Sequence, residues 1–349
     1  MTTESGVGRR RRFWLVAGLA ACLLAGGAAA MAGAAPSSSS SSIDKALSAA
    51  HSKYKGLKEG KNADYIPALA KVNSNIFGIA LVTVDGKVHT AGDVGTEVSI
   101  QSISKPLIMA RVIQDQGEAV VRDGVGVDAT GQDFGSITAV EQHKGKEMNA
   151  MVNPGAITMT SLVKGENADQ VWGNIIGTLN EFAGRSLSIN QEVYRSESET
   201  NQRNQAIAEL MKAYELLHGD PKQATDLYTR QCSVNVNAKD LATMAATLAN
   251  GGRNPVTRKQ VIDANHVPSV LAVMATAGLY DDSGKWLFAT GLPAKSGVGG
   301  GILAVSPGRF GIAVISPPLD AAGNSVRARK SIEDISNALG GNPFLSRPK

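Results

Sequence analysis

A serine and a lysine three residues apart are the first groups in this sequence whose spacing could support catalysis. Ser102 and Lys105 lie in "QSISKP", directly before the apolar run "LIMARVI". Because Pro106 is tolerated in a first helical turn, we expect a helix to start near Ser102, with both side chains on one face. Backbone N–H groups and the positive end of the helix would lie beside the serine, and burial would favour the neutral lysine. The pair could then act as a nucleophile and its base.

The same spacing also fits a serine that caps a helix and a lysine that points into solvent. A second motif favours the catalytic interpretation. Lys295–Gly297 in "AKSGVGGGI" stands at the start of a late strand and resembles the K-[ST]-G strand of serine β-lactamases and penicillin-binding proteins. The glycines at 297 and 299–301 would let a substrate lie against the backbone, although a glycine-rich bulge at a sheet edge would have the same composition.

The elements that must position these motifs follow from hydrophobic patterning. "FGIALVTVDGKVHTAGD" and "GILAVSPGRFGIAVISP" alternate on both sides of a turn and predict two hairpins. "SIDKALSAAHSKYKGL" and "SVRARKSIEDISNAL" predict a first and a last helix, and the middle of the chain has helical patterns such as "NQAIAELMKAYELL" and "AKDLATMAATLANGG".

This layout predicts an α+β fold, in which an antiparallel sheet is flanked by helices and carries an inserted all-helical lobe. We expect the sheet lobe at about 43–103 and 262–349 and the helical lobe at about 104–261. A cleft between two lobes is a common place for a ligand site.

The first residues have the pattern of an export signal. Arg9–Arg12 precede an apolar stretch, and small residues around Ala32–Ala34 are followed by serines. We expect residues 1–34 to be the signal, cut near Ala34 or Ala35, and 35–42 to be a serine-rich linker. The adjacent arginines also fit the twin-arginine route. Because the apolar run is long enough to cross a bilayer, an uncleaved anchor is the alternative.

Removing this leader changes the charge balance of the chain. The whole sequence has 35 basic and 31 acidic residues, and without residues 1–34 it has 31 and 30. No basic cluster interleaved with aromatic residues remains, which argues against nucleic-acid binding. Only Cys232 lies outside the leader, which excludes a disulfide scaffold and a cysteine metal site. The five histidines lack metal-ligand spacing, so we expect no metal and no other cofactor.

Several short motifs occur in the same order as in the serine-dependent glutaminases, a family of the β-lactamase/penicillin-binding-protein-like superfamily. They are "YIPALA", "QSISKP", "NPGAI", "SESETNQRN", "YTRQCSV", "GLYDDSGKW" and "LPAKSGVGGGI". The resemblance runs from about Ile43 to the last helix. Pro154 replaces the usual alanine, Val98 replaces a usual aromatic residue, and the leader is unusual for these enzymes.

The resemblance implies hydrolysis of L-glutamine to L-glutamate and ammonia through a glutamyl-serine intermediate. Ser102 would be the nucleophile, Lys105 its base partner and Tyr280 a proton relay to the departing ammonia. The implied substrate-binding residues are Tyr65, which closes over the pocket, Ser102, Asn153, Glu197, Asn204, Tyr228, Tyr280 and Val298. The backbone N–H groups of Ser102 and Val298 would hold the oxyanion.

The implied set matches the chemistry of free glutamine. Glu197 is its only acid and suits the substrate ammonium, and the asparagines and tyrosines supply neutral donors for the carboxylate. Taken singly, each residue also has a structural interpretation: the tyrosines in the core, the asparagines as caps, and Glu197 at a solvated helix start.

Two other functions share these features. One is a periplasmic β-lactamase or penicillin-binding-like acyl-serine enzyme, and the other is a non-catalytic amino-acid-binding protein with the same fold. The Asn, Tyr and Glu set favours a free amino acid as the small-molecule partner. From the leader we expect a periplasmic or secreted protein without stable membrane association once the leader is removed. The family's habit suggests a homo-oligomer, either a dimer or a tetramer.

Overall fold

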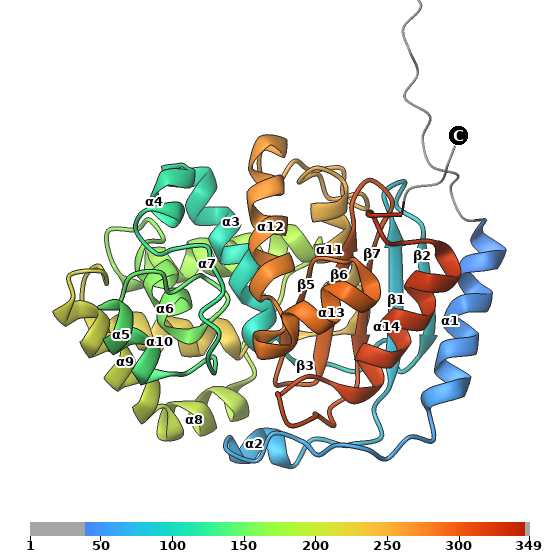
Figure 1. The fold of residues 1–349 in the computed structure, drawn as a ribbon, viewed down its shortest axis with the longest axis horizontal. Helices are drawn as coiled ribbons and strands as arrows, with labels where there is room; N and C mark the ends of the chain where they lie inside the picture. Colours follow the sequence, from blue (N-terminus) through green and yellow to red (C-terminus); the bar gives the residue numbers. More distant parts are fainter. Residues whose placement is uncertain (1–38, 346–349) are drawn as a thin grey trace, which may run out of the picture. The chain divides into compact units, whose positions relative to one another are not determined.

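Two hairpins from opposite ends of the chain build the central sheet (Figure 1). The computed structural model describes residues 39–345. The sheet is antiparallel, with the strand order β2-β1-β7-β6-β5. Its strands are β1 (Gly78–Thr83), β2 (Val88–Gly92), β5 (Ala294–Gly297), β6 (Gly301–Ser306) and β7 (Phe310–Ile315). The predicted β1–β2 and β6–β7 hairpins are confirmed, and β1 pairs with β7 to join the early and late parts of the chain.

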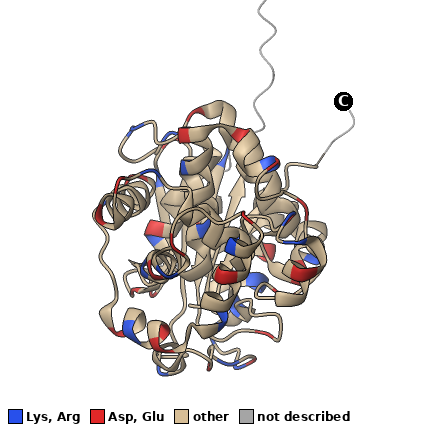
Figure 2. Cartoon of the chain, turned by 90° about the vertical axis from the view of Figure 1, so that its left-hand side faces the viewer, with Lys and Arg blue, Asp and Glu red and all other residues tan. Residues whose placement is uncertain are grey.

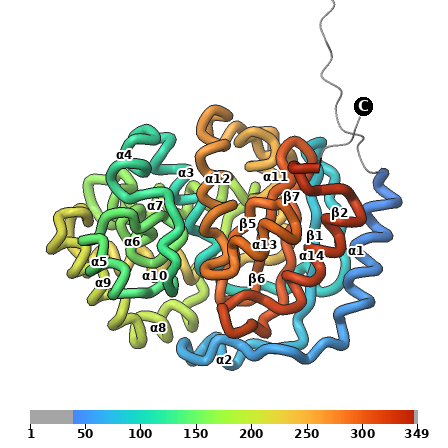
Figure 3. Tube along the Cα trace, in the orientation of Figure 1, coloured from blue at the N-terminus to red at the C-terminus, as the bar shows by residue number. Residues whose placement is uncertain are grey.

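The two faces of the sheet pack against different helices, because side chains alternate along a strand. Ile79, Leu81 and Ile312 point toward α1 (Ser40–Tyr54), α13 (Ser283–Thr290) and α14 (Val326–Leu339). Figure 3 shows α1 and α14, from the two ends of the described chain, side by side on this face.

The opposite face of the sheet packs on α11 (Ala238–Ala249), through Ala80, Val82 and Ala313 among others. The approach is close enough that a Cβ on Gly311 would lie 2.0 Å from the backbone nitrogen of Ala246. Only a glycine in the strand allows this contact.

The helical lobe lies to the side of this sheet in Figure 1. Its helices are α3 (Lys105–Gln116), α4 (Glu118–Arg122), α5 (Ile137–His143), α6 (Asn153–Ser161), α7 (Ala168–Ala183), α8 (Gln191–Thr200), α9 (Gln202–Ala213) and α10 (Pro221–Cys232). The remaining elements are α2 (Pro67–Ala70), α12 (Val267–Ala277), the short strands β3 (Val98–Ser99) and β4 (Asn235–Val236), and the 3-10 turns η1 (Gln101–Ser104), η2 (Ala264–His266) and η3 (Tyr280–Asp282).

Two predicted boundaries differ from the structure. The predicted helical lobe of residues 104–261 includes α11, but this helix packs across the sheet, because it is buried along its whole length and its alanines at 242, 245 and 246 allow a close approach to the strands. We also assigned residues 35–42 to a linker, but α1 begins at Ser40. Ser39 caps it, its side chain accepting a hydrogen bond from the backbone N–H of Ser42 at 3.2 Å.

The α+β fold class, with an antiparallel sheet flanked by helices, is confirmed. On the side of the molecule drawn in Figure 2, basic and acidic residues are interspersed along the helices and loops. Within residues 39–345 no helix combines the length and the apolar character needed to span a membrane. The predicted export signal lies outside the described residues.

Candidate active site

Ser102 lies on the sharp turn between strand β3 and helix α3. The turn is the 3-10 helix η1, and the backbone of Ile100 anchors it by donating to the carbonyl of Val234 at 2.8 Å. Gln101 has φ +50°, a left-handed conformation that is rare for a residue with a long side chain. On this turn Ser102, the candidate nucleophile, lines a cavity of 490 Å³.

Lys105 is the first residue of α3 and is 1% exposed. Its ammonium donates to Asn153 Oδ1 at 2.8 Å and to the carbonyl of Met151 at 3.2 Å. Burial lowers the pKa of Lys105 to about 7, because the charged form loses its hydration. Near neutral pH the amine can therefore hold or release a proton.

The Ser102 side chain lies close enough to the Tyr280 phenol to lower the pKa of that phenol, against the larger raising effect of burial. Among the described hydrogen bonds of Lys105 Nζ none goes to Ser102, so the predicted serine–lysine contact is not direct in this structure. Tyr280 sits on η3 with φ +55° and donates to the carbonyl of Ser296 at 3.3 Å. Burial raises the pKa of Tyr280 to about 12, so the phenol keeps its proton and can donate it.

The two sequence motifs meet here, because strand β5 runs beside η1. Lys295 is fully buried, and its ammonium donates to the carbonyls of Gly278 at 2.9 Å and Ser296 at 2.8 Å. The same nitrogen lies 4.1 Å from the centre of the Tyr280 ring. Lys295 thus links strand β5 to the aromatic ring of Tyr280. Burial lowers the pKa of Lys295 well below its ordinary value.

Glu197, on α8, is a buried carboxylate, only 6% exposed. It accepts one hydrogen bond, from Gln101 Nε2 at 3.2 Å, and forms no ion pair within the described part of the chain. Burial raises its pKa to about 7, against the smaller lowering effects of Gln101 and the Lys105 charge. A cationic group entering the cavity would find an acceptor that no protein cation occupies.

Neutral polar groups face the same cavity from three helices. Asn153 Nδ2 donates to Asn204 Oδ1 at 3.0 Å, and the Tyr228 hydroxyl donates to Asn153 Oδ1 at 3.3 Å. Pro154 stands in the first turn of α6, where proline is tolerated, and Asn153 still reaches the cavity.

The cavity contains most of the residues that the sequence singled out. Those that line it are Tyr65, Ser102, Asn153, Glu197, Asn204, Tyr228 and Val298. Tyr65 is 54% exposed, and Tyr280 lines an adjoining cavity of 260 Å³. Lys105 reaches the first cavity through its hydrogen bond to Asn153.

Sequence reasoning missed several residues that line or support the site. Gln101 directly precedes Ser102, and Arg203 directly precedes Asn204. Only this adjacency to predicted site residues could have identified them from the sequence. Phe134 lies in a loop with no recognisable pattern. The Asn153 N–H donates to the carbonyl of Phe134 at 2.7 Å, and Arg203 Nε donates to that of Gly135 at 2.8 Å, so the loop is held over the cavity.

Residues 60–344 match the family model of glutaminase. The glutaminase of Colwellia psychrerythraea is 50% identical over 302 residues, 86% of this chain and 97% of the relative. That of Mycobacterium marinum is 50% identical over 297 residues, 85% of this chain and 93% of the relative.

Solved structures agree with these relatives. A probable glutaminase, ybaS, has a TM-score of 0.87 at 45% identity and covers 88% of this chain and 100% of its own. A probable glutaminase from Bacillus subtilis, solved with 6-diazo-5-oxo-L-norleucine, has a TM-score of 0.79 at 31% identity. The match covers 86% of this chain and 97% of that protein. The predicted β-lactamase-like fold is confirmed by these neighbours.

Proposed function

The chain belongs to the glutaminase family and is a glutaminase, and from that premise we propose that it hydrolyses L-glutamine through a glutamyl-serine intermediate on Ser102. One observation carries the proposal: a buried carboxylate without a cation faces the same cavity as Ser102. Free glutamine presents the missing cation at one end and a neutral amide at the other.

Binding follows from matching charges and donors. The substrate ammonium pairs with Glu197, which a cation keeps ionised near neutral pH. The substrate carboxylate accepts from the amide and hydroxyl donors of Asn204 and Tyr228, and Asn153 links these to Lys105. The side-chain amide then extends toward Ser102, and Tyr65 covers the opening.

Acylation forms one bond and breaks another. The neutral amine of Lys105 takes the Ser102 proton, directly after a small movement or through a neighbouring group, and Ser102 Oγ attacks the amide carbon. The oxyanion accepts from the backbone N–H groups of Ser102 and Val298. The Tyr280 phenol gives a proton to the amide nitrogen and regains one from Lys105, the C–N bond breaks, and ammonia leaves.

Hydrolysis of the intermediate reverses these roles. A water molecule loses a proton to Lys105 and its oxygen attacks the glutamyl carbonyl carbon. The bond between that carbon and Ser102 Oγ breaks, and the serine oxygen takes the proton from Lys105. Glutamate and the free serine result, and no cofactor is needed for either step.

The test is removal of the nucleophile. We expect Ser102→Ala to abolish hydrolysis and to leave the circular dichroism spectrum and L-glutamate binding largely unchanged. Lys105→Ala should lower turnover by several orders of magnitude, because either half of a nucleophile–base unit is needed. Release of ammonia by Ser102→Ala within tenfold of the unmutated rate would rule out the serine mechanism.

We also propose that the chain is exported and assembles as a dimer or tetramer. The basic and apolar leader at 9–35 supports export, and the family's habit supports the oligomer. N-terminal sequencing of protein from the cell envelope should give a start near Ala35 or Pro36, and an intact Met1 in the cytoplasm would contradict export. Light scattering on the purified protein measures the assembly.

A further inference from the structure

Two adjoining cavities at the candidate site are lined by different residues of the predicted catalytic and binding set. Ser102, Glu197 and Asn204 line the cavity of 490 Å³, whereas Tyr280, but none of those three, lines the cavity of 260 Å³. Tyr65, Phe134 and Val298, together with Asp133, line both. The nucleophile and the amino-acid end of the substrate therefore face one space, and the proton donor for the leaving nitrogen faces another.

We propose that the smaller cavity is a separate route by which ammonia leaves and the hydrolytic water enters, while the glutamyl group stays in the larger one. This inference rests on the proposed function. The amide nitrogen departs from the carbon bonded to Ser102 with the proton from Tyr280, so it leaves on the Tyr280 side. A water molecule arriving there adds its oxygen to the same carbon, and the proton it loses returns to Ser102.

The wall between the cavities is fixed to the catalytic groups. The Phe134 ring packs on the Tyr280 ring with 4.8 Å between centroids, and the backbone carbonyl of Phe134 accepts from the N–H of Asn153. Val298 stands on the turn between β5 and β6 and is buried. The residues shared by the two cavities are therefore held in place by contacts with the groups that line the larger cavity.

The lining of the smaller cavity suits ammonia and its cation better than glutamate. Asp64 pairs with Lys61, and Asp320 pairs with Arg329. The two other carboxylates of this lining, at positions 133 and 281, form no ion pair within the described residues. A surplus of negative charge attracts ammonium and repels the glutamate carboxylates, which favours exit of the two products by different routes.

The steric test places a larger side chain at a residue that lines the smaller cavity and not the larger one. Ala322 lines only the smaller cavity, and Ala49, exposed on α1, lines neither. With γ-glutamyl methylamide, whose leaving amine is bulkier than ammonia, we expect Ala322→Phe to lower kcat at least about tenfold. With L-glutamine the loss should be about threefold or less, and the inhibition constant of L-glutamate should stay within about twofold. Ala49→Phe should change none of these.

Equal losses on both substrates, no loss on either, or weaker L-glutamate inhibition in parallel with the losses would overturn the proposal. Each of these results would make the smaller cavity part of the binding pocket or of the fold alone. Should Ala322→Phe fail to fold, Ala322→Leu carries the same comparison. An active Ser102→Ala enzyme would overturn the proposed function itself, whereas its inactivity together with equal losses would overturn only the separate route.

The charge test uses methylammonium as a probe of the smaller cavity. We expect it to inhibit without competing with L-glutamine, because the two occupy different spaces. Asp281→Asn should raise its inhibition constant at least about threefold and leave that of L-glutamate unchanged. The control Glu209→Gln, exposed on α9, should change neither. Purely competitive inhibition by methylammonium, or an unchanged constant in Asp281→Asn, would overturn the route.

Discussion

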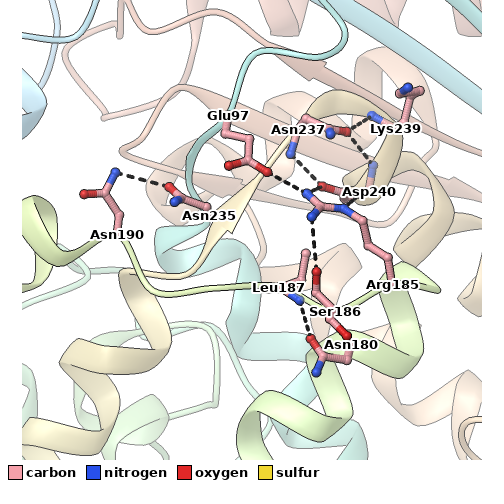
Figure 4. Close-up of polar contacts among 10 residues, drawn as sticks. All are labelled: Glu97, Asn180, Arg185, Ser186, Leu187, Asn190, Asn235, Asn237, Lys239 and Asp240. Carbon is pink, nitrogen blue, oxygen red and sulfur yellow. Dashed lines mark hydrogen bonds and ion pairs between the residues drawn. The ribbon is translucent and has the colours of Figure 1, made fainter.

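Two carboxylates of this protein are equally buried and have opposite surroundings. Asp240, at the start of α11, is 5% exposed and accepts two hydrogen bonds from Arg185, at 2.7 and 2.6 Å, and one from the backbone of Asn237 at 2.9 Å (Figure 4). Arg185 also pairs with Glu97. Glu197, 6% exposed, has a single long hydrogen bond from an amide.

The difference separates a carboxylate that holds the fold from one that awaits a ligand. Burial of a charge costs free energy unless partners replace its hydration. Around Asp240 the protein supplies all of the partners, and they join the end of α7 to α11 and to the segment before β3. Around Glu197 the described residues supply no cation, so ionising this carboxylate costs free energy until a substrate ammonium pairs with it.

The largest expected effect separates the two carboxylates by activity. Glu197→Gln should lower kcat/KM for L-glutamine about 30- to 5,000-fold, since loss of one partner of a desolvated charge pair costs about 2–5 kcal/mol. Steady-state kinetics measures this. N-acetyl-L-glutamine, which has no ammonium, should be a poor substrate and lose much less. Equal losses on both substrates would mean that Glu197 does not contact the ammonium.

Asp240→Asn should give the opposite pattern. It removes one of the two carboxylates paired with Arg185 and weakens the three hydrogen bonds that Asp240 accepts, so we expect the free energy of unfolding to fall by about 1–3 kcal/mol. The kcat/KM of the folded enzyme should stay within about twofold. Urea denaturation measures the loss, and Glu97→Gln, at the exposed side of the same arginine, should cost less than about 1 kcal/mol. A large loss of activity in folded Asp240→Asn would break the comparison.

The effect of Glu197→Gln on the free energy of unfolding should depend on pH. Its pKa is raised from the ordinary value of 4.5 to about 7, so folding favours its protonated form. The cost of ionising it is absent below pH 4.5, appears as the pH rises, and is complete above pH 7. Glu197→Gln should therefore stabilise the protein by on the order of 1–3 kcal/mol more at pH 8 than at pH 5. Denaturation at both pH values checks this, and equal changes would contradict it.

The smallest expected effect is on the acid side of the pH profile. Catalysis needs neutral Lys105 and ionised Glu197, whose pKa values are both about 7. The logarithm of kcat/KM should fall below pH 7 with a slope approaching two, as a property of the coupled pair. In Glu197→Gln the slope should approach one, a difference of about tenfold for each pH unit. A slope of two in that variant would exclude Glu197 as the second group.

The local features of this site were readable from the sequence, and the long-range ones were not. Alternation around two turns predicted the hairpins. The serine and lysine spacing, taken together with the Lys295–Gly297 motif, favoured a catalytic site over a helix cap with a solvated lysine. The functional assignments of Glu197 and Tyr228 came only from resemblance, because singly they look like ordinary helix residues. Nothing local indicates that Arg185 meets Asp240, or that Gln101 adopts a left-handed backbone. Such features depend on contacts between segments far apart in the chain.

The position of β1 within the sheet also sets an order of events during synthesis. Gly78 pairs with Ile315, so β1 has only its hairpin partner until the end of the sheet has left the ribosome. At about 5–20 residues per second, that wait lasts roughly ten seconds or longer. The helical lobe, whose contacts are more local, can form meanwhile. A newly made chain therefore carries an open, apolar strand edge beside a folded lobe, a state that favours chaperone binding and, at high expression, aggregation.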